Sequence, residues 1–93
     1  MTPLATALLA ERTLRRWNQR TAAQELGVSQ AQYQKWESGE NEPGGRYYPR
    51  IFEFLRLTEP QAAELILQDR LARARVSLQE AEEWKSRGPR GNG

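Results

Sequence analysis

The sequence predicts an all-α fold: a compact domain of four to five helices that ends in a longer C-terminal helix. Three observations support this prediction. Leucines and alanines recur at the spacing of helix faces, capping and helix-breaking residues divide the chain at short intervals, and no run alternates between polar and apolar residues as a strand does. At 93 residues the chain is expected to form one small unit with a modest core.

The first two helices have recognisable beginnings. Thr2 and Pro3 form a cap and first-turn pair, because proline lacks only an N–H that a helix start leaves unused. This pair predicts a helix over residues 3–16. Asn18 predicts a second helix that runs to residue 26, because an asparagine side chain can accept a hydrogen bond from a free N–H of the first turn.

Two glycines delimit the third helix. Gly27 ends the second helix in the left-handed conformation, which glycine adopts without a steric penalty. Ser29 caps a third helix over residues 30–38, and Gly39 stops it. The composition of residues 40–46 predicts a loop.

The remaining chain predicts two more helices. A short fourth helix is expected over residues 48–57, and Thr58 with Gln61 has the spacing of a capping box. In the fifth helix a 4-3-4-3 spacing of apolar residues, typical of helix pairing, defines a seam: Leu67, Leu71, Ala74, Leu78 and Ala81. This helix is predicted to be continuous, with a break near Val76 as the alternative.

The composition excludes several classes of protein. There are no cysteines and no histidines, so disulfides, thiolate metal sites and the commonest general base and metal ligand are absent. We therefore expect no enzyme activity, no cofactor and no metal. No apolar run approaches the ~20 residues of a membrane span, and a cytoplasmic location is expected. With 14 basic and 12 acidic residues, the charge permits a nucleic-acid partner without demanding one.

Residues 18–39 form the most informative segment. Ala23 lets two short helices cross closely, Gly27 permits the tight turn between them, and Val28 fills the corner. Tyr33 and Trp36 point the aromatic face of the third helix inward. Together these residues predict a central helix-turn-helix unit.

The opposite face of the third helix is polar. It carries amides, a small residue and one cation, which can hydrogen-bond base edges or pack on a thymine methyl group: Gln30, Ala31, Gln32, Gln34 and Lys35. Gln32 stands at the margin of this set. A merely solvated helix face is the alternative interpretation.

The segment LGVSQAQYQKWESGENEP, with Gln19 at the first position of the second helix, resembles the Cro/phage-repressor type of helix-turn-helix, also called the xenobiotic-response-element family. The resemblance covers about residues 4–58. It implies double-stranded DNA as the partner, base contacts from the polar face of the third helix, and phosphate contacts from five residues: Asn18, Gln19, Asn41, Arg46 and Tyr47. Where the family usually has a glycine ahead of the second helix, this sequence has Arg16 and Trp17.

These features predict a sequence-specific transcriptional regulator that reads a two-fold symmetric operator. We divide the chain into a DNA-binding domain over residues 1–58, a helical extension over residues 59–86 that forms a homodimer through the seam, and a disordered tail over residues 87–93. Packing of the seam on the chain's own core is the alternative. One or two of four nearby arginines are expected to reach phosphate, unless all are a solubilising surface: Arg12, Arg15, Arg16 and Arg20.

A second function remains open at this point. Glu40 and Glu42 occupy a loop where many relatives carry lysine or arginine, which weakens the electrostatic attraction to phosphate. The alternative is a helix-turn-helix used as a protein-binding module, of the anti-activator or antitoxin kind, with the C-terminal helix as its docking surface.

Overall fold

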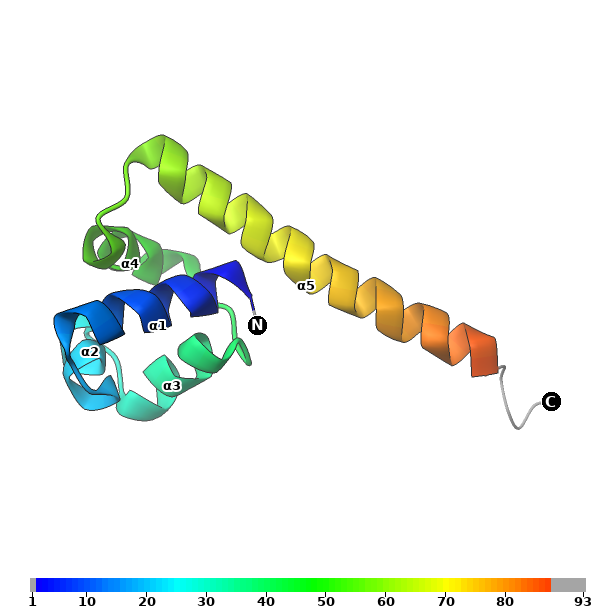
Figure 1. Ribbon diagram of the computed structural model, residues 1–93, viewed down its shortest axis with the longest axis horizontal. Coiled ribbons are helices and arrows are strands. Elements are labelled where there is room, and N and C mark those ends of the chain that lie inside the picture. Colours follow the sequence, from blue (N-terminus) through cyan, green and yellow to red (C-terminus); the bar gives the residue numbers. More distant parts are fainter. Residues whose placement is uncertain (1, 88–93) are drawn as a thin grey trace.

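The computed structural model describes the backbone of residues 2–87 and the side chains of residues 2–82. Over this range all regular elements are helices, as predicted, and there is no strand: α1 (Pro3–Arg15), α2 (Gln19–Leu26), α3 (Gln30–Ser38), the 3-10 helix η1 (Gly45–Tyr47), α4 (Tyr48–Leu55) and α5 (Glu59–Arg87). Helices α1 to α4 form a body, and α5 runs past α1 and beyond it (Figure 1). Apart from Arg87, the tail predicted to be disordered lies outside the described residues.

The predicted helix starts are present as capping hydrogen bonds. The side chains of Thr2, Asn18 and Ser29 each accept from the main-chain N–H three residues later, at 3.2, 2.8 and 3.1 Å. Gly27 and Gly39 end their helices with φ of +73° and +83°. These caps fix where α2 and α3 begin and end, and therefore the geometry of the turn between them.

Two predicted helix ends are wrong by one or two residues. Helix α1 ends at Arg15 and α4 at Leu55, because Arg16 and Arg56 adopt the left-handed conformation with φ of 61° and 57°. Their amides donate back to carbonyl oxygens three residues earlier, at 3.0 and 3.1 Å. Arginine is not a usual residue for this position, since a side chain there costs roughly 1–2 kcal/mol relative to glycine. The residue type therefore does not indicate that either helix ends at this position.

The core lies between α1, α2, α3 and α4. Its fully buried large side chains are Trp36, Tyr33, Leu8 and Ile51. The inward orientation predicted for the two aromatic residues of α3 is thus confirmed. Around them pack smaller groups of α2 that let the helices approach: Ala22, Ala23 and Leu26.

Helix α5 is continuous, so the alternative with a break near Val76 is wrong. It begins at the predicted capping box: the amide of Thr58 donates to Gln61 Oε1 at 2.9 Å. The buried face of α5 contains Ala62 and Asp69, which are 6 % and 3 % exposed. None of the helices within residues 2–87 combines the length and the apolar character that a membrane span requires.

The seam of α5 faces away from the body. Leu67, Leu71 and Leu78 are 52 %, 42 % and 64 % exposed, and Ala74 and Ala81 are exposed as well. Because Leu67 and Leu71 each lie two residues from Asp69, they sit about 160° around the helix from that buried side chain. The interpretation in which the seam packs on the chain's own core is therefore wrong. The protein is elongated, 53 × 29 × 23 Å, because α5 extends beyond the body (Figure 1).

Candidate nucleic-acid interface

The outer face of α3 is open to solvent. Gln30, Ala31, Gln34 and Lys35 are exposed, and Gln32 is half-buried at the margin of the same face. Three of these residues line a hollow with Ser38 and Glu40. The helix therefore presents two amides, a methyl group and a cation side by side.

A rigid layer of aromatic rings supports this face from behind. Tyr33 and Trp36 are each 0 % exposed, and the Trp36 ring lies 5.2 Å from the ring of Tyr47, just before α4. Aromatic pairs at such distances prefer tilted arrangements like this one. The packing fixes the rotation of α3 about its own axis, and with it the direction in which the exposed residues point.

A buried polar network ties α3 to α1 and α2. Arg12 of α1 makes a two-pronged contact with the Glu37 carboxylate, with Nε to Oε2 at 2.7 Å and Nη2 to Oε1 at 2.9 Å. The same carboxylate accepts from the hydroxyl of Tyr33 at 2.7 Å and from Nε2 of Gln19 at 3.0 Å. Bidentate contacts between a guanidinium and a carboxylate are among the stronger hydrogen-bonded pairs.

The network sets the charge state of its members. Burial by itself would raise the pKa of Glu37, but the hydrogen bonds from Arg12, Gln19 and Tyr33 hold that pKa below its usual value. Burial, together with the bond to the carboxylate, raises the pKa of Tyr33. Glu37 is therefore an ionised carboxylate, held by the neutral phenol of Tyr33 and the guanidinium of Arg12.

Sequence reasoning missed the role of Glu37. A signal was available. Glu37 follows Tyr33 by four residues, so the two side chains share one face of the helix. Once Tyr33 is assigned to the interior, Glu37 must be buried beside it and needs a cationic partner.

The five residues to which the resemblance assigns phosphate contacts lie in different environments. Asn18, Asn41 and Arg46 are exposed, whereas Gln19 and Tyr47 are half-buried. One N–H of Gln19 is bonded within the protein, as described above. The guanidinium of Arg46 donates to the hydroxyl of Tyr47 at 2.7 Å and lies 4.8 Å from its ring centre, so these two residues form one unit.

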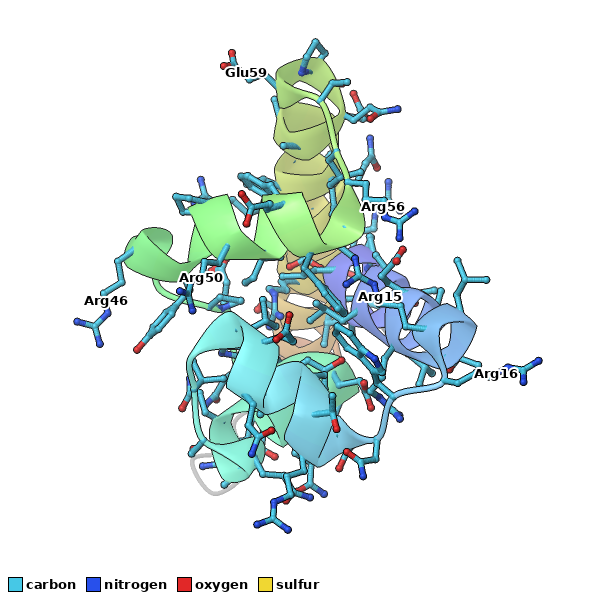
Figure 2. All side chains as sticks on the ribbon, turned by 90° about the vertical axis from the view of Figure 1, so that its left-hand side faces the viewer. Arg15, Arg16, Arg46, Arg50, Arg56 and Glu59 are labelled. Carbon is cyan, nitrogen blue, oxygen red and sulfur yellow. The ribbon has the colours of Figure 1, made fainter. Side chains whose placement is uncertain are left out.

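The four arginines at the α1–α2 junction divide into two pairs. Arg15 donates to Glu11 at 2.8 Å and to the carbonyl of Phe54 at 2.6 Å, and Arg12 is held by Glu37. Arg12 and Arg15 are therefore bound by groups of the protein itself, whereas the expectation that one or two of the four arginines reach phosphate stays a prediction. Arg16 and Arg20 are exposed. Figure 2 shows Arg15 between α1 and α4, whereas Arg16 and Arg46 project from opposite sides of the body.

The loop after α3 is fastened to α5. Arg73 donates to the carbonyl oxygens of Gly39 at 3.2 Å and Asn41 at 3.4 Å. Nearby, the carboxylate of Glu42 lies 3.8 Å from the guanidinium of Arg70, which also belongs to α5. Part of the acidic charge in this loop is thus offset by α5.

No cluster of ligand side chains suited to a metal ion occurs among the residues that the structure describes. Comparison of the sequence with known protein families shows that residues 8–61, more than half of the chain, match a family described as "Helix-turn-helix". No curated protein and no solved structure gives a significant match.

Proposed function

Because the chain belongs to the helix-turn-helix family of the Cro/C1 type, whose members bind DNA, we propose that it is a sequence-specific transcriptional regulator and that a homodimer reads a two-fold symmetric operator. The observation that supports this proposal best is the outer face of α3, where amide and cationic groups are exposed over a rigid aromatic layer. In the proposal, α3 enters the major groove.

Base reading is assigned to the exposed face of α3. Gln30 and Gln34 offer amides, whose paired donor and acceptor match the edge of adenine, and Lys35 can donate to the O6 and N7 acceptors of guanine. Ala31 provides a methyl group for contact with thymine. Gln32, half-buried, borders this set.

Phosphate contacts are assigned to both sides of α3. On one side lie Asn18 and Gln19 at the start of α2, where unpaired N–H groups favour an anion; Gln19 retains a second N–H on Nε2 after its bond to Glu37. On the other side lie Asn41 and the unit formed by Arg46 and Tyr47. Contacts on both flanks fix the register of a helix on the duplex.

The homodimer is assigned to the seam of α5, whose leucines are all exposed. Leucine and alanine at 4-3-4-3 spacing form a stripe on which a second helix can pack. A dimer on B-DNA presents its two reading helices about 34 Å apart, one turn of the duplex. Two half-sites in inverted orientation are therefore expected.

Selection of bound sequences from a random DNA pool, at two salt concentrations, tests the proposal. The expected result is an enriched inverted repeat, with affinity that falls as salt rises because counterions are released from phosphate. Enrichment of a single half-site would contradict the dimer, and no enrichment at all would contradict DNA reading.

Removal of one base-reading side chain is expected to weaken binding and relax sequence preference. Gln30→Ala or Lys35→Ala should each cost about 1–2 kcal/mol on the selected site. Gln68→Ala is the matched control, since this exposed glutamine bonds only to Glu64 within α5. The check is an affinity titration against the selected site and against single-base variants of it. An unchanged base preference in both variants would exclude α3 as the reading helix.

A charge placed on the seam is expected to separate the dimer. Leu78→Glu should shift the protein toward monomers in sedimentation velocity, because two carboxylates would be buried in the interface. Val76→Glu is the control: Val76 is also exposed, at 54 %, but lies about 160° around the helix from Leu78. If both variants sediment like the unmodified protein, the interface lies elsewhere.

One observation favours the second candidate function, a protein-binding module. A groove of about 850 Å³ separates α1 from the first turns of α5, and its walls are mainly apolar, with Ala7, Leu14, Leu55 and Leu65 among them. Leu14 is 73 % exposed there. Apolar grooves between helices accept amphipathic helices of partner proteins. An absence of enriched DNA in the selection experiment would favour this candidate.

A further inference from the structure

The loop between α3 and η1 joins two parts of the molecule, the reading helix and α5. We propose that Arg73 of α5 is a positioning residue of the DNA interface: it fixes the main chain of residues 39–41 beside α3 and does not contact DNA itself. The inference rests on the proposed function, which assigns a phosphate contact to Asn41.

Arg73 holds the loop at two points. Its Nη1 donates to the carbonyl of Gly39 and its Nη2 to the carbonyl of Asn41, at 3.2 and 3.4 Å. A guanidinium is planar and its N–H groups diverge at fixed angles, so two carbonyls bound to it keep a fixed separation. The amide of Asn41 in turn donates to the carbonyl of Lys35 at 3.2 Å. Asn41 is thus anchored to α3 through its N–H and to α5 through its C=O.

Arg73 is itself held by a buried carboxylate. Asp69 is 3 % exposed and accepts from Arg73 Nε at 2.9 Å and from the amide of Leu4 at 2.8 Å. The second bond places the carboxylate at the N-terminus of α1, where the helix dipole favours negative charge. Only a quarter of the Arg73 side chain is exposed. The guanidinium is therefore fixed from α1 and α5 before DNA arrives.

This arrangement affects DNA binding through Asn41. An exposed loop residue that must become ordered on contact with phosphate loses conformational entropy, and prior ordering reduces that loss. Arg73 provides the ordering by bonding to the main chain, which leaves the side chain of Asn41 free for phosphate. The same bonds connect α5, the proposed dimer helix, to the DNA-contacting loop.

The first test measures the affinity of Arg73→Ala for the selected operator over a range of salt concentrations. Affinity is expected to fall about tenfold, while the slope of log affinity against log salt stays unchanged because no phosphate contact is lost. The matched control is Arg75→Ala, which removes the same charge from an exposed position two residues further along α5. Its affinity is expected to stay within about twofold, since screening by salt limits the effect of a distant charge.

A second variant separates positioning from a general weakening of the fold. In an Asn41→Ala background, the effect of Arg73→Ala is expected to shrink to about twofold, because coupled sites are not additive whereas independent ones are. Asp69→Asn keeps an acceptor for the amide of Leu4 and removes the charge that holds Arg73. It is expected to lower affinity in the same direction, and it replaces Arg73→Ala if that variant does not fold.

Hydrogen exchange gives a readout without DNA. The amide of Asn41 is expected to exchange about tenfold faster in Arg73→Ala, while amides of α2 keep their rates, because opening would be local to the loop.

Unchanged exchange at Asn41, or full additivity of the effects of Arg73→Ala and Asn41→Ala on affinity, overturns the proposal. A salt slope lowered by about one unit also overturns it, since Arg73 would then contact phosphate directly. If the unmodified protein selects no DNA, the proposed function fails, and the exchange result alone decides whether Arg73 orders the loop.

Discussion

Arg12→Ala is expected to destabilise the fold by about 3 kcal/mol, because it leaves the Glu37 carboxylate without a cationic partner in a buried position. The carboxylate side chain is 7 % exposed and cannot turn to solvent without displacing Tyr33, whose hydroxyl donates to it at 2.7 Å. Urea unfolding at neutral pH measures the effect. A loss below about 1 kcal/mol, the value typical of surface pairs, would show that water replaces the guanidinium.

The pH dependence follows from the lowered pKa of Glu37. A carboxyl group whose pKa is depressed by folding contributes stability above its unfolded pKa, and that contribution is lost as pH falls through the folded value. The unmodified protein should therefore lose stability on acidification below about pH 4.5, the ordinary pKa of this group. The difference in free energy of unfolding between Arg12→Ala and the unmodified protein should become smaller over the same pH range. Glu37→Gln is the control, because its side chain does not titrate. If this variant loses stability on acidification to the same extent as the unmodified protein, the loss is due to other carboxyl groups.

Gly27→Val is expected to destabilise the fold by about 2–3 kcal/mol, since a β-branched residue is forced into the left-handed region at φ +73°. A Cβ at this position would also lie 2.7 Å from the guanidinium of Arg50, although that flexible group can move aside. The backbone conformation therefore accounts for most of the loss. Thermal unfolding measures it.

Gly45→Val provides the comparison for that experiment. Gly45 has no positive φ, and a Cβ at this position would have open space within 4 Å, so the substitution should change stability by about 0.5 kcal/mol or less. Equal stability of the two valine variants would mean that the turn between α2 and α3 relaxes to another conformation.

Local signals make most of the fold predictable. Helix starts depend on a side chain and an N–H three residues away, so Thr2, Asn18 and Ser29 are identified from their residue types and local sequence positions. The inward face of α3 follows from helical phase. The wrong helix ends at Arg16 and Arg56 show the limit, because the tertiary structure there imposes a conformation that the residue type disfavours.

Long-range polar contacts are not predictable in the same way. Arg12 and Glu37 are separated by 25 residues, and Leu4 and Asp69 by 65. Such pairs depend on how helices pack, and charge alone does not distinguish a buried arginine from an exposed one. For this reason four neighbouring arginines look alike in the sequence, although Arg12 and Arg15 are structural.

The overhang of α5 beyond Arg73 has a consequence for how the protein responds to its own abundance. The side chains of residues 74–82 are all exposed. A short helical arm of this kind is only marginally stable in water, and about 12–15 residues is the usual lower limit for persistence. In the proposed dimer, formation of the helical arm is coupled to its association with a second arm. Dilution therefore favours the unfolded arm, and a higher protein concentration favours the helical one. Operator occupancy would then rise more steeply than protein level, giving a threshold without any effector.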